Sequence, residues 1–283
     1  MITPDLVRQR VRNLPTLPTT VVALGQAVGD DRCTVDRILG ILSKDPPLSA
    51  AMLRLANSVA FSGDNRVSDL RAAIMRLGFD AVLNLGRTAA IIRTFKDSKH
   101  LDPILLWQHS VALALTAKAI CRIQRNRAME ETAFLAGLLH DIGKIALDRS
   151  FSDEYAPVVE AFLAGEFIVD AEQRLLGITH AQVGAMVAEN WNFPEDFAEA
   201  IRDHHAPPKD RYLPNLLHLC DLLVRTRIPN GPADETLIVV LEELPAFHEV
   251  FKPGADFDLE RLTFSIDDEL EHAVAFVQLA FQD

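Results

Sequence analysis

Apolar residues recur at helical spacing along nearly the whole chain, and no run alternates in the way that indicates a strand. In the first hundred residues, Pro18 stands where a helix can begin and Gly78 where one can end. Ser68 or Asp69 can cap the helix before Gly78, and Asp45-Pro46-Pro47 is expected to interrupt the pattern. The helices predicted here cover about residues 18–28, 35–43, 48–58, 69–77 and 80–94. The pattern predicts an all-α fold.

A second block follows, from about residue 104 to residue 228, and its helices are predicted to be more deeply buried. Leu105–Ile123 is apolar almost all round, which is typical of a core helix. Further helices are expected at about 130–144, 155–163, 169–176, 181–191, 195–205 and 213–227. In the acidic, amphipathic tail, helices are expected at about 234–243 and 258–281.

Two polar or turn-forming segments divide the chain. Lys96–His100 is polar and precedes Pro103, and Pro229-Asn230-Gly231-Pro232 precedes the tail. The expected division is a helical subdomain at 1–100, a second helical subdomain at 101–228, and a C-terminal helical extension at 229–283.

Composition limits the partners and the compartment. The chain of 283 residues carries a formal net charge of −12, which argues against nucleic acid as the main ligand because a phosphate backbone needs a basic surface. Cys33, Cys121 and Cys220 are odd in number and widely spaced, so we expect buried free thiols in a reducing cytoplasm. The first residues do not resemble a signal peptide, and no apolar run approaches the ~20 residues that span a bilayer. The prediction is a soluble cytoplasmic protein without a membrane partner.

The most informative stretch is Leu138–Lys144, which reads Leu-Leu-His-Asp-Ile-Gly-Lys at the end of an apolar run. Burying His140 and Asp141 is costly unless they have a partner, and a cation bound by both would be one. Adjacent side chains in a helix point about 100° apart, so both can reach one ion only near a helix end. Gly143 is expected to end or distort the helix there.

Further histidines and an aspartate of the second block lie near predicted helix ends or on apolar helices. Taken singly, each histidine could be a hydrogen-bonded core residue and each aspartate a helix cap. His248 and His272 in the tail are expected to be plain surface or core residues. Together, the buried candidates would otherwise need several separate partners. The candidate metal ligands are His109, His140, Asp141, His180, His204, His205 and Asp221.

The order His109, then His140-Asp141, then Asp221 resembles the HD superfamily of metal-dependent phosphohydrolases. Those proteins hold one metal with such a set, and Lys144 stands where HD enzymes often contact a substrate phosphate. The resemblance implies a catalytic role for Asp141 and Lys144. In a site with two metals, Asp141 is the natural bridge, because a carboxylate has two oxygens.

Other features are similar to HD-GYP phosphodiesterases, which cleave cyclic dinucleotides. His180 and the pair His204-His205 lie where those enzymes carry histidines for a second metal. The Gly-Tyr-Pro signature is absent, because Ala206-Pro207-Pro208 follows the pair. This departure argues against a cyclic dinucleotide substrate and leaves the metal site intact.

The N-terminal block resembles the HDOD domain, the HD-related output domain of bacterial signalling proteins. The resemblance rests on three segments, Leu14–Pro18, Asp45–Ser58 and Ala73–Gly78, and covers about residues 7–210. It implies an HD-like multi-helix bundle with an N-terminal helical subdomain. HDOD domains are described as regulatory outputs that have lost the HD catalytic residues, whereas this sequence keeps them.

Three functions stay open at this point. The first is an HDOD-type output domain that signals to a protein partner and retains a metal site. The second is a metal-dependent phosphohydrolase or phosphodiesterase acting on a nucleotide or cyclic dinucleotide, and the third is a site that binds a nucleotide without cleaving it. The expected cofactor is one or two divalent ions, with Fe or Mn favoured and Zn or Mg as alternatives.

Overall fold

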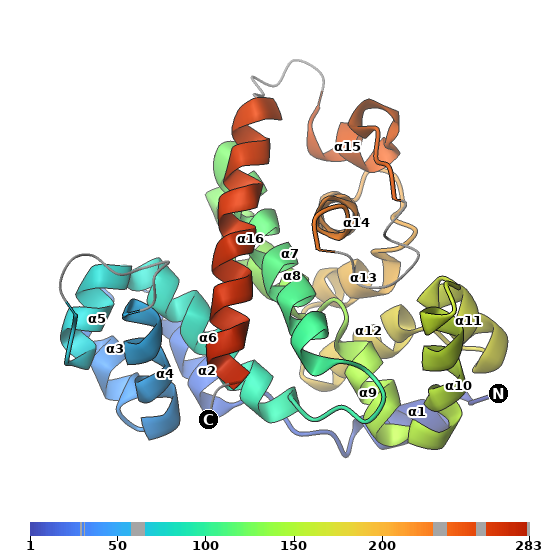
Figure 1. Ribbon diagram of the computed structural model, residues 1–283, viewed down its shortest axis with the longest axis horizontal. Coiled ribbons are helices and arrows are strands. Elements are labelled where there is room, and N and C mark those ends of the chain that lie inside the picture. Colours follow the sequence, from blue (N-terminus) through green and yellow to red (C-terminus); the bar gives the residue numbers. More distant parts are fainter. Residues whose placement is uncertain (29, 31, 58–65, 229–236, 253–258, 282–283) are drawn as a thin grey trace. The chain divides into compact units, whose positions relative to one another are not determined.

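The computed structural model describes residues 1–28, 30, 32–57, 66–228, 237–252 and 259–281 (Figure 1). Within these ranges the secondary structure is helical and contains no strand, which confirms the predicted all-α class. The chain forms two compact units: Met1–Leu14 with Asp97–Leu270, and Pro15–Lys96 with Glu271–Asp283. These units differ from the expected three-part division, because the first residues belong with the second helical block and one boundary falls inside the last helix.

The unit built around Pro15–Lys96 contains a series of short helices and a longer one. They are α2 (Thr19–Val28), α3 (Val35–Leu42), α4 (Pro46–Ala56), α5 (Leu70–Leu77) and α6 (Phe79–Phe95). The predicted cap of α5 is confirmed, since the Asp69 side chain accepts a hydrogen bond from the amide of Ala72 at 2.8 Å. Gly78 ends α5 with φ +80°, a conformation that glycine adopts without strain.

The prediction that Asp45-Pro46-Pro47 interrupts the helical pattern was wrong in one respect, because Pro46 is the first residue of α4. Proline fits the first turn of a helix, where its missing N–H has no intrahelical partner. Asp45 supplies the cap by accepting from the amide of Leu48 at 3.2 Å. Ser58, the last residue of the Asp45–Ser58 segment, lies outside the described residues.

The larger unit holds the remaining helices and ends within the last one. They are α1 (Pro4–Val11), α7 (Pro103–Ile123), α8 (Arg127–Leu139), α9 (Ile142–Ser150), α10 (Ser152–Leu163), α11 (Ile168–Leu175), α12 (His180–Asn190), α13 (Glu195–Asp203), α14 (Tyr212–Arg225), the 3-10 turn η2 (Leu241–Glu243), α15 (Pro245–Val250) and α16 (Leu259–Phe281). α7 packs against α8 and α14, while α12 packs against α9 and α13. Helix α1 was not predicted, although Thr3 and Pro4 give it a side-chain cap and a proline in its first turn.

The 21-residue helix α7 is long and apolar enough to cross a membrane by length and composition alone. The prediction that no apolar run approaches that length is wrong by this criterion. However, 83% of its apolar window is buried inside the protein, as in the core helix of a globular unit. Residues on every side of the helix are buried, among them Trp107, His109 and Lys118, so α7 forms the centre of the larger unit.

Part of the predicted tail lies outside the described residues, namely 229–236, 253–258 and 282–283. The prediction of a helix at 234–243 is wrong for residues 237–243. Of these, 237–240 are not helical and Leu241–Glu243 form only the 3-10 turn η2. Helix α15 was missed, and α16 matches the last prediction. His248 is exposed, and the His272 side chain lies outside the described residues. The cysteines are unpaired as expected, although Cys33 is only half-buried.

Candidate metal centre

The chain is not helical through residue 144 as predicted, because α8 ends at Leu139 and α9 begins at Ile142. Between them, Asp141 adopts φ −98° and ψ 8°, which breaks the run of helical hydrogen bonds. The break turns the His140 and Asp141 side chains toward a common region, which a continuous helix would prevent. The helix end that the two ligands require is therefore present, at Leu139 and not at Gly143.

Gly143 does not end a helix, and the prediction that it would was wrong. It is the second residue of α9, and a Cβ atom added there would lie 1.9 Å from the carbonyl oxygen of His180 and 2.7 Å from the amide nitrogen of Gly184. The absent side chain allows α9 and α12 to approach backbone to backbone. This close packing brings His180 to Asp141.

Helix α12 begins at His180 because Thr179 forms a capping box with Gln182. The Thr179 hydroxyl accepts from the amide of Gln182 at 3.3 Å, and the Gln182 side chain accepts from the amide of Thr179 at 3.0 Å. Two of the unsatisfied amides at the helix start are thereby paired. This local capping fixes the start of α12 close to the predicted residue 181.

We expect Thr179→Ala to lower the free energy of unfolding by about 1 kcal/mol, the usual cost of losing such a cap. Urea unfolding of the metal-free protein measures it. Thr3→Ala, at the longer 3.4 Å cap of α1, is the matched control and should cost less. An equal or larger loss in the Thr3 variant would contradict this account of the α12 start.

The two oxygens of Asp141 face different neighbours. Oδ1 lies 3.1 Å from Nε2 of His180 and 4.0 Å from Nε2 of His204. Oδ2 lies 3.3 Å from Nε2 of His140 and 2.6 Å from Nζ of Lys144. Asp141 and His180 are at most 2% exposed. One buried carboxylate is thus shared by two sets of side chains.

The first set, which we call the HD group, consists of His109, His140 and Asp141, whose ligand atoms lie within 4.8 Å of one another. His109 comes from α7, and its Nε2 lies 3.0 Å from Oδ1 of Asp221 on α14. Asp221 is in turn 3.4 Å from the guanidinium of Arg225. The packing of α7 against α14 therefore supplies two of the predicted ligands from residues far apart in the sequence.

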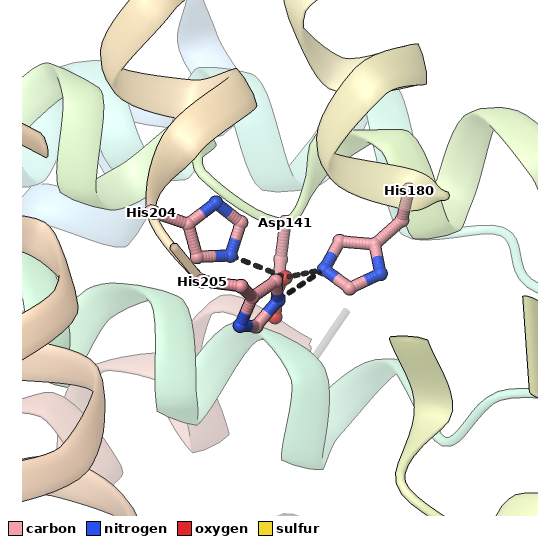
Figure 2. A group of neighbouring side chains, drawn as sticks. All are labelled: Asp141, His180, His204 and His205. Atoms are coloured by element: carbon pink, nitrogen blue, oxygen red, sulfur yellow. Dashed lines mark hydrogen bonds and ion pairs between the residues drawn. The ribbon is translucent and has the colours of Figure 1, made fainter. Parts of the chain in front are cut away.

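The second set, the histidine group, consists of Asp141, His180, His204 and His205, again with ligand atoms within 4.8 Å. Figure 2 shows the three imidazole rings gathered around the Asp141 carboxylate. His204 and His205 follow the last residue of α13, and Nε2 of His205 lies 2.9 Å from Nε2 of His180. Three ring nitrogens and a carboxylate oxygen facing one point form a donor set suited to a divalent cation.

Several donor atoms of this region are buried but lack a hydrogen-bond partner within the described part of the chain. They are both ring nitrogens of His109, Nε2 of His140, Nε2 of His204 and Oδ1 of Asp141. The close contacts of these atoms given above lack the geometry of a hydrogen bond. Buried polar atoms are rarely left unsatisfied unless an ion or water completes them. The arrangement fits a bound metal.

The tautomers of two histidines follow from their other contacts. Nδ1 of His140 lies 2.7 Å from the carbonyl of Gly137, and Nδ1 of His204 lies 2.6 Å from the carbonyl of Ile201. A carbonyl oxygen only accepts, so Nδ1 donates in both rings and Nε2 keeps its lone pair. In each ring that lone pair points toward the other candidate ligands, as metal binding requires.

The electrostatics favour neutral His204 and His205 and an ionised Asp141. The pKa of His180 is instead raised, because Glu172 and Asp141 outweigh the effect of its burial. Burial, together with the His140 and His180 rings, lowers the pKa of His204 to about 3. Burial alone would raise the pKa of Asp141, but His140 and Lys144 hold it well below its usual range. Burial likewise lowers the pKa of His205, with His204 adding to the effect. The neutral imidazoles of His204 and His205 and the ionised Asp141 are the forms in which these side chains bind cations.

The structure therefore brings all the candidate ligands and Lys144 into one region of the larger unit. His205 is partly exposed and Asp221 reaches the centre through His109, whereas the others contact Asp141 or its neighbours directly. Sequence analysis missed Glu172, which is fully buried and bonds to His180. A single acidic residue on a short amphipathic helix gives no signal in the sequence.

Comparison with known proteins places this geometry in a family. The sequence profile of the HDOD domain matches residues 14–207. An HDOD domain protein of unknown function from Geobacter sulfurreducens is 27% identical and superimposes with a TM-score of 0.81, covering 99% of this chain and 98% of its own. A provisionally named phosphohydrolase from Shewanella amazonensis SB2B is 24% identical and superimposes with a TM-score of 0.73. The alignment covers 97% of this chain and 98% of that protein.

A sequence relative is longer than this chain. An uncharacterized protein of Treponema pallidum (strain Nichols) is 23% identical over 203 residues, which are 71% of this chain and 39% of that protein. The chain thus spans about two fifths of the length of the curated relative it matches. Because the family profile covers well over half of the sequence, the chain belongs to the HDOD domain family.

Proposed function

We propose that this chain is a regulatory output domain of a bacterial signalling pathway, acting in the cytoplasm on a protein partner, and that it holds an HD-type metal centre. The observation that carries the proposal is the buried pair of donor groups joined by Asp141. Support for signalling comes from the fold, which resembles a provisionally named signal transduction protein from Marinobacter aquaeolei VT8 (TM-score 0.74, 23% identity). This chain covers 98% of its own length and 64% of that protein in the alignment.

The ligands of the proposed centre divide between the two groups. His109 and His140 would bind a cation with one oxygen of Asp141, and His180, His204 and His205 would bind another with the second oxygen. Asp221, whose Oδ1 lies 3.0 Å from Nε2 of His109, would be a further ligand of the first cation. A bound divalent ion would lower the pKa of a coordinated water toward neutrality. The mixture of imidazole and carboxylate favours Fe or Mn, with Zn or Mg as alternatives.

The position of Lys144 favours regulation over catalysis. Its ammonium is 2.6 Å from Oδ2 of Asp141, and the residue is only 5% exposed. In that position it neutralises the shared carboxylate and does not extend toward solvent. The expected contact between Lys144 and a substrate phosphate would require this buried ion pair to open, which is costly.

A metal-dependent phosphohydrolase is the second candidate, and the shared carboxylate is the observation that favours it. Paired donor groups are typical of sites that hydrolyse phosphate esters with two metals. The charges are also suitable. Among the charged groups around the histidines, the carboxylates of Asp141, Glu172 and Asp221 outnumber the cations of Lys144 and Arg225 by one. A divalent ion would reverse the sign and attract a phosphate or nucleotide.

The first test is the metal content of the purified protein, before any metal is added, and of the His140→Ala variant. We expect bound Fe or Mn in the wild type and markedly less metal in the variant. The loss of a direct ligand should lower the affinity for the metal at least about tenfold. His248→Ala is the control, since His248 is exposed and bonds only the carbonyl of Glu242 among the described contacts. Equal metal content in the wild type and His140→Ala would refute the HD group.

A second measurement separates the two functions. The metal-loaded protein is incubated with bis(p-nitrophenyl) phosphate and with a cyclic dinucleotide, beside His140→Ala. A regulatory domain predicts bound metal with no hydrolysis above that of the variant. Hydrolysis that disappears in His140→Ala would instead establish the phosphohydrolase.

A further inference from the structure

A carboxylate that no prediction included lies behind the histidine group. Glu172 on α11 is fully buried, and its Oε2 lies 2.7 Å from Nδ1 of His180 and 2.7 Å from the backbone nitrogen of the same residue. Its Oε1 accepts from the hydroxyl of Tyr155 on α10 at 2.9 Å. A buried anion with three such bonds is fixed in one orientation.

This support differs from that of the neighbouring histidines. Nδ1 of His140 and Nδ1 of His204 donate to backbone carbonyls, which are neutral acceptors. Nδ1 of His180 faces an ionised carboxylate. Because a carboxylate only accepts, Nδ1 carries a proton. Nε2 of His180 lies 3.1 Å from Oδ1 of Asp141, and it would present its lone pair there to a bound cation.

The chemistry of the pair has a direct consequence for a cation. A carboxylate that accepts from one nitrogen of an imidazole fixes the ring and makes the other nitrogen a stronger donor. Glu172 also bonds the first amide of α12, so the ring and the helix start are held by the same side chain. Its charge therefore acts most directly on His180 of the histidine group.

We infer that Glu172 is a positioning residue that sets the cation affinity of the histidine group by orienting His180 and increasing its basicity. The inference rests on the proposed metal centre. The alternative is that Glu172 only stabilises the start of α12. If Glu172 positions His180, removing its charge while keeping its shape lowers the metal affinity. If it only stabilises the helix, the metal affinity is unchanged.

The test is titration of the metal-free protein with Mn²⁺, following free Mn²⁺ by electron paramagnetic resonance, together with the melting temperature of the metal-free protein. Glu172→Gln keeps the shape of the side chain and removes its charge. We expect the dissociation constant of one Mn²⁺ to rise about 10- to 100-fold, the usual cost of losing such a partner. Tyr155→Phe, which removes only the bond to Oε1, should stay within about threefold.

Three outcomes decide the matter. Unchanged Mn²⁺ affinity in Glu172→Gln, with or without a lower melting temperature, would overturn the inference and leave Glu172 a structural residue. If Glu172→Gln does not fold, Glu172→Asp takes its place. It keeps the charge but withdraws the oxygen from Nδ1, and unchanged affinity there would be equally decisive. A wild-type protein that binds no Mn²⁺, Fe, Zn or Mg would refute the metal centre itself. A wild-type protein and a Glu172→Gln variant that bind Mn²⁺ equally tightly would refute only the role of Glu172.

Discussion

Asp141→Asn is expected to abolish metal binding in both donor groups and to destabilise the metal-free protein. Asparagine has nearly the shape of aspartate, so the packing around residue 141 should be unchanged. However, the amide keeps a single oxygen and carries no charge, whereas Oδ1 faces His180 and His204 and Oδ2 faces His140. A neutral side chain cannot serve as a shared anionic ligand, so elemental analysis should find little bound metal.

The loss of stability has a separate cause, the ammonium of Lys144. This group is 2.6 Å from Oδ2, and the residue is 5% exposed, so the substitution leaves a buried cation without its partner. Breaking a buried pair on one side costs about 3–5 kcal/mol. We expect a loss of that order in the free energy of unfolding, measured with urea on the metal-free protein at pH 7.

A double variant separates the two effects. Lys144→Met in the Asp141→Asn background removes the unpaired cation and fills similar space, so most of the lost stability should return. Metal binding should not return, because the carboxylate is still absent. Recovery of metal in the double variant, or an Asp141→Asn protein as stable as the wild type, would contradict the account of the centre given above.

The helix ends show what local sequence could predict. Asp69, Gly78 and Thr179 act within a few residues of themselves, through a side-chain cap, a left-handed backbone or a capping box. Their effects can be predicted from neighbours in the chain. The candidate ligands could also be nominated, because several histidines and carboxylates on apolar helices would otherwise be unsatisfied.

The errors involve interactions between segments far apart in sequence. The break between α8 and α9 looks helical from its residues alone, and there Asp141 contacts His180 at the start of α12 and His204 just after α13. Glu172 acquires its role only when α11 approaches the start of α12. In the tail, the apolar pattern suggested a helix near residue 240, where the chain forms only a short turn before Pro245. Local periodicity cannot report any of these contacts.

Gly143 is the position where such a contact has the largest expected effect. A Cβ there would lie 1.9 Å from the carbonyl oxygen of His180, 2.7 Å from the amide nitrogen of Gly184 and 2.8 Å from the carbonyl carbon of His180. All three are backbone atoms of α12, so no flexible side chain can move aside. The two helices would have to separate, which also withdraws His180 from Asp141.

We therefore expect Gly143→Ala to cost at least about 3 kcal/mol of unfolding free energy, the upper part of the range for overpacking, and to lower metal content in the histidine group. Gly40→Ala is the matched control. Gly40 lies within α3 and is exposed, with no atom within 4 Å of an added Cβ, so the same change should stabilise by about 0.5–1 kcal/mol through helix propensity. Urea unfolding and elemental analysis of both variants provide the measurement. A Gly143→Ala protein with wild-type stability and metal would show that α9 and α12 do not need their close approach, and the assembly of the centre around Asp141 would need another explanation.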